Sequence, residues 1–207
     1  MDTADLAPRL ETDTATATET QTQTAATEIA ETGALVLRDA TAADAERLME
    51  VIHLAYRRNT GRAWTSEAHL IEGMRITGPA LRGLIGAPGR RLLAAVQDGA
   101  VVGCCSIERQ GESAHFGLFA VDPARQAGGL GRRVLAEAER AAREAWDTRE
   151  MRMTVLTARE ELIAWYVRRG YRRTGELSPF PYDEPTVGVP VRADLAFELL
   201  VKDITAG

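Results

Sequence analysis

The hydrophobic and polar positions of this chain follow two periods, and each period predicts one kind of element. Leu48, Ile52 and Ala55 recur at helical spacing after the motif Thr-Ala-Ala-Asp at 41–44, which has the form of a helix capping box. Short apolar runs bounded by turn residues predict strands instead, and Asp-Gly at 98–99 predicts a tight hairpin between two of them. Helices and strands are therefore expected to be interspersed along the chain.

The predicted elements begin near Ala34. Strands are expected at residues 34–38, 91–96, 100–107, 114–121, 151–156, 171–176 and 195–201. Helices are expected at 45–55, at 65–75, for a short stretch from Pro79, at 130–146 and at 160–169. This order predicts an α/β (α+β) single domain, in which a mixed central sheet of about seven strands is flanked by helices on both faces.

The first 32 residues differ from the rest in composition. From Thr12 to Thr24 every second residue is threonine, and Asp, Ala, Glu and Gln stand between, so neither face of a strand would be hydrophobic enough to bury. We therefore predict a disordered acidic Thr/Ala-rich tail over 1–32, followed by one domain over 33–207. A recognition or regulatory arm is the alternative interpretation of the tail.

The net charge of the chain is concentrated in that tail. Residues 1–33 carry seven acids and one arginine, and the whole chain has a formal charge of −5, so the remainder sums to +1. Such a nearly neutral body lacks the dense basic face of a nucleic-acid-binding protein, so no nucleic acid is expected as a partner. No apolar run approaches the roughly 18 residues of a membrane span, and no secretory signal is recognisable. A cytoplasmic protein without a membrane partner is expected.

The cysteines and histidines predict neither a disulfide nor a metal site. Cys104 and Cys105 are adjacent in a predicted strand, so their side chains would point to opposite faces, and a reducing compartment fits. The three histidines, His53, His69 and His115, have no metal-binding spacing. Surface or packing roles are the simpler interpretation of the first two.

A glycine-rich loop at 121–131 joins a predicted strand to a predicted amphipathic helix. Glycines let successive backbone N–H groups turn toward one point, and a helix N-terminus adds positive potential, so the loop suits an anion. The Gly-x-x-x-x-Gly-Lys of a P-loop is absent, and the preceding meander argues against a Rossmann arrangement. A tight turn without a ligand is the alternative.

The segment Gln-Ala-Gly-Gly-Leu-Gly at 126–131, preceded by Val-Asp-Pro at 121–123, resembles the Gln/Arg-x-x-Gly-x-Gly/Ala signature of the GNAT acetyltransferases. In that family the loop amides hold the pyrophosphate of coenzyme A, so the resemblance implies acetyl-CoA as cosubstrate. The implied contacts are Phe119, Ala120, Val121, Gln126, Ala127, Gly128, Gly129, Leu130, Gly131 and Arg132. Arg125 and Arg133 are further candidate phosphate contacts, and for both of them and for Arg132 solvated surface charge is the alternative.

A second motif lies at 162–171, where Leu-Ile-Ala-Trp-Tyr-Val-Arg-Arg-Gly-Tyr resembles the Tyr-x-x-x-Gly-Phe/Tyr pattern of the family's late helix. The resemblance implies that Tyr166 lies near the coenzyme sulfur and protonates the departing thiolate. A phenol suits this role because it is neutral at pH 7. Where the family often has Asn, seven residues before this tyrosine, the chain has Arg159. A core aromatic is the alternative role of Tyr166.

Amine acetylation also requires a proton acceptor and a group that polarises the thioester carbonyl. The resemblance implies that a backbone N–H near 119–121 polarises the carbonyl. Histone-type members carry a glutamate six residues before the valine of Val-x-Pro, and this chain has His115 there, which would take the proton directly or through water. Glu108 is the second candidate base, and a half-exposed strand histidine is the alternative role of His115.

The acceptor is the part of the reaction that the sequence defines least. In the family the early helices and the final strands shape the acceptor pocket, so the candidate contacts are Trp64, Tyr182, Asp183 and Glu184, with surface loops as the equal alternative. The predicted function is acetyl-CoA-dependent transfer of an acetyl group to a small-molecule or peptide amine, by direct attack in a ternary complex. The alternative is a non-catalytic acyl-CoA-binding sensor or interaction module, and homodimer formation stays open.

Overall fold

The computed structural model describes residues 34–57, 66–125, 127–183 and 188–205, so the predicted tail at 1–32 lies outside it. In chain order the elements are β1 (Val36–Asp39), η1 (Ala42–Asp44), α2 (Ala45–Arg57), β2 (Ile71–Glu72), α3 (Gly78–Leu84), β3 (Arg90–Gln97), β4 (Ala100–Gln110), β5 (Ser113–Val121), η2 (Pro123–Arg125), η3 (Ala127–Gly129), α4 (Leu130–Trp146), β6 (Glu150–Leu156), α5 (Glu160–Val167), β7 (Arg172–Pro179), β8 (Val189–Pro190) and β9 (Ala196–Asp203). Across the described residues, none of the helices combines the length and the hydrophobicity needed to span a membrane.

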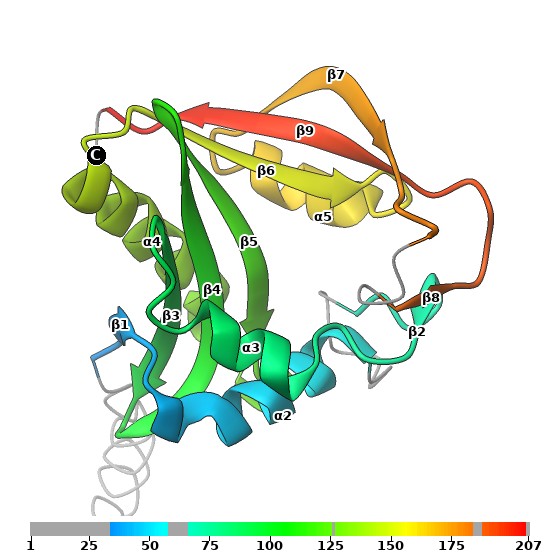
Figure 1. The fold of residues 1–207 in the computed structure, drawn as a ribbon. Coiled ribbons are helices and arrows are strands. Elements are labelled where there is room, and N and C mark those ends of the chain that lie inside the picture. Colours follow the sequence, from blue (N-terminus) through cyan, green and yellow to red (C-terminus); the bar gives the residue numbers. More distant parts are fainter. Residues whose placement is uncertain (1–33, 58–65, 126, 184–187, 206–207) are drawn as a thin grey trace, which may run out of the picture. The chain divides into compact units, whose positions relative to one another are not determined.

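The expected mixed sheet of seven strands is confirmed. Its strands lie in the order β1-β3-β4-β5-β6-β9-β7. Only β5 and β6 run parallel, whereas the other neighbouring pairs are antiparallel. β9 lies between β6 and β7 although it follows both in sequence, so the last strand completes the interior of the sheet and β7 is left at an edge (Figure 1).

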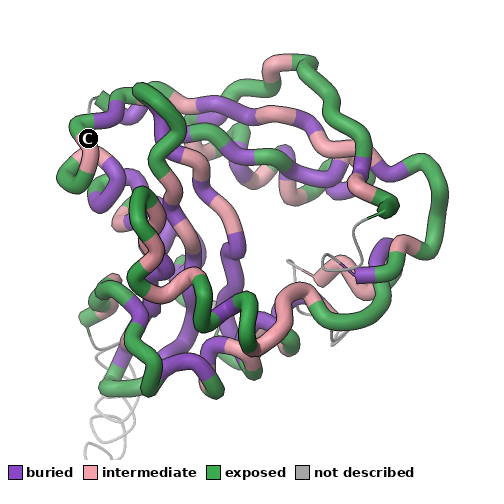
Figure 2. Tube along the Cα trace, in the orientation of Figure 1, coloured by how far each residue is buried: buried purple, intermediate pink, exposed green. Residues whose placement is uncertain are grey.

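Helices cover both faces of this sheet, as expected. On one face Cys105 of β4 packs in a core with Val134 of α4 and Ile163 of α5. On the other face Cys104 packs in a second core with Leu48 of α2. The adjacent cysteines therefore point into different cores, and both are free thiols. Figure 2 shows that the buried residues concentrate in the central strands and along the inner sides of the helices.

β5 and β6 start side by side and then separate (Figure 1). Only Ser113, Ala114 and His115 of β5 are paired with β6. Beyond them Leu118 has a φ of 43°, and the register of β5 against β4 shifts in the same stretch, which marks a β-bulge. A bulge bends its strand, so β5 turns away from β6 and the sheet is open between the two strands beyond His115.

The first turn of the α2 segment is held by Asp44, as the predicted capping box requires. The Asp44 carboxylate accepts hydrogen bonds from Thr41 N at 2.7 Å and from Thr41 Oγ1 at 2.8 Å. Arg38 of β1 donates two further bonds at 2.8 Å each. The Arg38 guanidinium holds the pKa of this buried carboxyl well below its usual range. The network ties β1 to α2.

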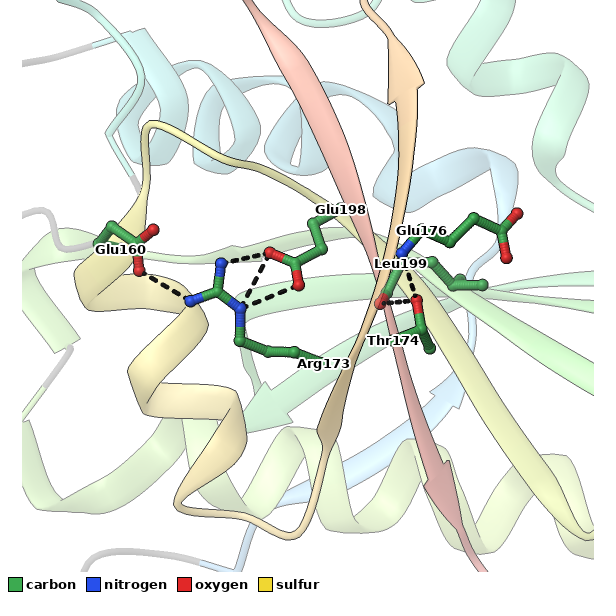
Figure 3. Close-up of polar contacts among 6 residues, drawn as sticks. All are labelled: Glu160, Arg173, Thr174, Glu176, Glu198 and Leu199. Carbon is green, nitrogen blue, oxygen red and sulfur yellow. Dashed lines mark hydrogen bonds and ion pairs between the residues drawn. The ribbon is translucent and has the colours of Figure 1, made fainter.

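The edge strand β7 is held to β9 by polar contacts more than by burial (Figure 3). Arg173 Nε donates to both carboxylate oxygens of Glu198, at 2.9 and 3.0 Å, and Arg173 Nη1 donates to Glu160 of α5 at 3.2 Å. Thr174 Oγ1 donates to the Leu199 carbonyl at 2.9 Å. Glu198 is buried, so Arg173 provides the charge partner that a buried carboxylate needs.

The helix predicted at 65–75 is wrong. Its described part, from Ser66, contains a turn and then the two-residue strand β2, which pairs with β8. Leu70 and Ile71 are buried side by side in a third core, and Gly73 follows with a φ of 80°. Contacts with distant residues of that core bury this pair, and a left-handed glycine ends a helix. β8, which pairs with β2, is a strand that the sequence pattern did not predict.

Candidate functional site

A cavity of about 150 Å³ lies where β5 and β6 separate. Residues of α2, β5, β6, α5 and β9 line it, together with residues from the segment that precedes α3. Among the residues singled out by the sequence, His115, Phe119, Arg159 and Tyr166 line this cavity. The opening in the sheet therefore brings the predicted base and the predicted acid to one place, although they are far apart in the chain.

His115 is half-buried at the last position where β5 is paired with β6. It stands directly opposite Glu108 of β4, on the same face of the sheet. Burial lowers the pKa of His115 below its ordinary 6.5, against an opposing effect of Glu108. The imidazole is therefore neutral at pH 7 and able to accept a proton. Glu108 forms an ion pair with Arg90 and does not line the cavity, so the geometry favours His115 over Glu108.

Tyr166 lies on α5 within a group of aromatic rings. Its ring packs edge-to-face against Trp165 and Tyr171, with centroid distances of 5.0 and 5.7 Å. Trp165 in turn lies 6.2 Å from Phe119 of β5. Burial raises the pKa of Tyr166 well above its ordinary value. The phenol therefore keeps its proton throughout the physiological pH range, which is the state required of a proton donor.

The loop after β5 is anchored by the buried Asp122. Its carboxylate accepts a hydrogen bond from Arg47 Nη2 of α2 at 2.5 Å and another from Ala124 N at 3.0 Å. Arg47 Nε also donates to the Val101 carbonyl of β4 at 3.1 Å. One arginine thus links α2, β4 and the start of the loop, and the loop is fixed where it leaves the sheet.

Helix α4 begins without a side-chain cap. Gly128 and Gly129 have φ values of 76° and 74°, a region that favours glycine, and Gly129 is the N-cap residue. A Cβ atom at either position would meet no atom within 4 Å, so the space beside them is open. Leu130 and Gly131 are buried, whereas Gly128 and Gly129 are exposed, so the two glycines are the part of the helix start that a ligand can approach. Uncapped N–H groups and the positive helix end suit a phosphate.

Positive charge accompanies this helix start. Arg169, at the end of α5, is stacked on Trp165 with its Cζ 3.5 Å from the ring centroid, and its Nη1 donates to the Trp165 carbonyl at 2.7 Å. Burial lowers the pKa of Arg169, and the charges of Arg168 and Arg132 lower it further. Arg132 of α4 is therefore close enough to the end of α5 to add to one positive region, which favours an anion.

Other predicted residues do not reach the cavity. Tyr182 Oη accepts from Leu195 N at 2.7 Å and donates to the Arg192 carbonyl at 3.3 Å, so it fixes a surface loop. Arg125 forms an ion pair with Asp98 at 3.8 Å. Exposed and outside the cavity lining are His53, His69 and Asp183. Outside the described residues lie Trp64, Gln126 and Glu184, whose roles stay predictions. No group of three metal-ligating side chains occurs in the described part of the chain.

Four charged or polar residues of the cavity were not singled out by the sequence pattern: Tyr56, Glu67, Arg75 and Thr154. Tyr56 follows Ile52 by four residues and continues the apolar stripe of α2, so the pattern indicates a packing role and nothing points to a role for its hydroxyl. Burial raises its pKa to about 12. Glu67 and Arg75 fall in the segment predicted as a helix, where nothing indicated that they would meet Tyr56.

The cavity and the loop belong to a known fold. The sequence model of the acetyltransferase (GNAT) domain matches residues 88–173, which include β3 to β6, the loop and Tyr166. No curated protein matches the chain by sequence.

Solved structures extend the likeness to the remaining elements. An N-acetyltransferase from Staphylococcus aureus Mu50 superposes with a TM-score of 0.63 at 8% identity, covering 84% of this chain and 100% of that chain. The ribosomal-protein-S18-alanine N-acetyltransferase from Escherichia coli superposes at 0.61 and 13% identity, covering 84% and 96%. PaiA N-acetyltransferase from Thermoplasma acidophilum, in complex with coenzyme A, superposes at 0.58 and 15%, covering 82% and 99%. The family match therefore identifies an acetyltransferase (GNAT) domain over residues 88–173, and the solved structures show that the elements on either side complete the same fold.

Proposed function

We propose that this protein transfers the acetyl group of acetyl-CoA to a primary amine by direct attack within a ternary complex. One observation carries the proposal: a half-buried neutral imidazole, His115, and a buried neutral phenol, Tyr166, line the same cavity at the opening between β5 and β6. A proton acceptor and a proton donor are the two groups that amine acetylation requires besides the reactants.

The cosubstrate would lie along the opening, with its pyrophosphate at the start of α4. The backbone of 127–131, uncapped and bordered by left-handed glycines, supports this position, and Arg132 adds positive charge. Phe119, which lines the cavity, and its neighbours Ala120 and Val121 would flank the acyl end, where a backbone N–H of this stretch polarises the thioester carbonyl. The complex of PaiA with coenzyme A supports the same use of the fold.

In the proposed reaction the amine nitrogen attacks the thioester carbonyl carbon and forms the new C–N bond. His115 takes the proton that the amine nitrogen loses. The C–S bond then breaks, and Tyr166 gives its proton to the departing thiolate, which leaves as the coenzyme thiol. Tyr166 is reprotonated from solvent, and His115 returns its proton to solvent, so both residues end in their starting states.

Tyr166→Phe tests the proposal because it removes only the phenolic oxygen and its proton. We expect kcat to fall by about 10² to 10⁴-fold, the usual contribution of general acid catalysis, with the affinity for acetyl-CoA unchanged. Release of the coenzyme thiol in single turnovers gives the rate, and calorimetry gives the affinity.

Tyr171→Phe is the matched control. It removes a phenol from the same aromatic group, but Tyr171 Oη bonds to Glu139 at 3.0 Å and lies outside the cavity lining. Loss of stability without loss of turnover is expected there. If the Tyr166→Phe protein turns over like wild type in single turnovers, the acid is another group. If wild type binds acetyl-CoA and acetylates no amine, the protein is an acyl-CoA-binding module and the catalytic proposal is wrong.

A further inference from the structure

The charged residues of the described chain that line the cavity are predominantly positive. Arg75 and Arg159 line it together with one acid, Glu67, and the pKa of His115 is lowered so that this residue is neutral. Because substrates are attracted by complementary charge, this composition bears on which amines can bind.

Glu67, the one acid among the described residues that line the cavity, is already neutralised by a neighbouring cation. Arg57 Nη1 donates to Glu67 Oε2 at 3.1 Å, and the side chains of Arg57 and Glu67 are only 4% and 14% exposed. Arg57 Nε donates to the Gly73 carbonyl at 2.6 Å, which fixes the guanidinium in place. A buried pair of this kind is costly to separate, so Glu67 is a poor partner for a second ammonium group.

Arg75 is held differently. Its guanidinium lies over the ring of Tyr56, with its Cζ 5.3 Å from the ring centroid. Within the described residues Arg75 has no carboxylate partner, whereas Arg38, Arg47 and Arg90 each have one. Stacking on an aromatic ring leaves the N–H groups at the edge of a guanidinium able to bind an oxyanion in a bidentate manner.

We propose that Arg75 binds an acidic group of the acceptor, so that the acceptor is a primary amine that also carries a carboxylate or phosphonate, such as a free amino acid. This inference rests on the proposed function, because it places the amine of the same molecule against His115. It names Arg75 as the residue that determines specificity. Diamines and other polycations are disfavoured, since their second charge would meet Arg75 and find Glu67 occupied by Arg57.

The first test compares matched pools of amines as acceptors for the full-length protein with acetyl-CoA. One pool contains α-amino acids, ω-amino acids and aminoalkyl phosphonates; the second contains the carboxamides of the same amino acids; the third contains diamines and spermidine. A carboxamide lowers the pKa of an α-amine, so the second pool has more neutral amine at pH 7.5 and an intrinsic advantage. We expect the acidic pool to be acetylated at least 10-fold faster in spite of it.

The second test examines Arg75 itself with the best acceptor of the acidic pool. Arg75→Gln should raise the KM for that acceptor by about 10- to 100-fold, the effect of losing a charge-assisted pair of hydrogen bonds, while the KM for acetyl-CoA stays the same. Arg75→Lys, which keeps the charge but not the fork, should restore part of the loss. Arg82→Gln is the control, because Arg82 is exposed on α3, outside the cavity lining, and likewise lacks a carboxylate partner among the described residues.

The outcomes separate this inference from the proposed function. If the carboxamides or diamines are acetylated as fast as the acidic pool, or if Arg75→Gln changes no KM, the acidic acceptor is wrong while the acetyltransferase assignment stands. If acetyl-CoA binds and none of the three pools is acetylated, the acidic acceptor is wrong, and the proposed function fails as well if peptide amines are not acetylated either. A preference for the acidic pool that disappears in Arg75→Gln and returns in Arg75→Lys supports the inference.

Discussion

The two sides of the cavity are built in different ways. The proposed cofactor side consists of the loop at 121–131, the start of α4 and Tyr166 of α5, and two short sequence motifs contain all of it. The proposed acceptor side consists of Tyr56, Glu67, Arg75 and His115, which come from separate parts of the chain and line one cavity where β5 and β6 separate.

This difference shows which kind of information each side needs. Binding a diphosphate requires backbone N–H groups in a fixed turn, and a turn is encoded by neighbouring residues such as Gly128 and Gly129. Binding a particular acceptor requires side chains of chosen charge at chosen places, and these can be supplied from any element that reaches the cavity. The cofactor side is therefore expected to tolerate changes on the acceptor side, and the reverse.

The largest effect is expected for Gly129→Trp, which attacks the cofactor side alone. A bulky residue at this left-handed N-cap would block the approach of the pyrophosphate to several N–H groups. We expect affinity for acetyl-CoA to fall at least about 100-fold, since each hydrogen bond to a charged group contributes about 1.5–3 kcal/mol. Calorimetry measures the affinity.

Gly111→Trp is the matched control for that change. Gly111, in the turn between β4 and β5, also has a left-handed φ, of 62°, and open space beside it, and it lies at the opposite end of β5 from the loop. Affinity equal to wild type is expected. If folded Gly129→Trp also binds acetyl-CoA like wild type, the loop is not the phosphate site.

A smaller effect is expected for His115→Ala, which attacks the acceptor side. The rate should fall by about 10- to 100-fold, because water replaces part of a lost general base, and affinity for acetyl-CoA should stay the same. In wild type the rate should fall as the pH drops through a pKa below 6.5, since burial disfavours the protonated imidazole and only the neutral form accepts a proton. The pH profile of single turnovers measures both.

The acceptor for this experiment must be a weakly basic amine that stays neutral across the pH range studied. Protonation of a more basic amine would itself lower the rate at low pH and imitate the effect of His115. His115→Ala should remove this pH dependence from the rate that remains. If the mutant keeps the same fall in rate at low pH, the base is another group, and Glu108 or an ordered water would be tested next.

The smallest effect is expected for Asp44→Asn at the start of α2, the helix that carries Tyr56. Stability at pH 7 should fall by about 1–2 kcal/mol, the usual value of a helix-cap carboxylate, with affinity for acetyl-CoA unchanged. The pKa of Asp44 is lowered in the folded state, so its contribution is present above the unfolded pKa of about 3.9 and declines as the pH falls below it. The difference between the urea midpoints of wild type and mutant should therefore be smaller at pH 3 than at pH 7, because the contribution is lost only as the pH falls through the folded pKa. Equal midpoints at pH 7 would contradict this account.

The sequence predicts the fold and the cofactor side because both depend on local patterns. Periodicity gave the strands and helices of the sheet, and the glycine loop gave the start of α4. It failed at 65–75, where Leu70 and Ile71 are buried by contacts with distant residues of the third core. It could not show that β5 bends at Leu118, because a left-handed leucine has no sequence signature. Because the bend could not be predicted, the residues that line the cavity with His115 could not be predicted either.

The adjacent cysteines allow the opening of the helical layer on each face of the sheet to be measured separately. Burial raises the pKa of Cys104 to about 12 and that of Cys105 well above its usual value, so neither thiol reacts until its surroundings open. Cys104 becomes reactive when the layer of α2 and α3 detaches, and Cys105 when the layer of α4 and α5 does. The chain holds no third cysteine, so the labelling rates of Cys104→Ala and Cys105→Ala report the opening of one layer each. A bound coenzyme that stabilises only the layer of α4 and α5 would slow the labelling of Cys105 and leave the labelling rate of Cys104 unchanged.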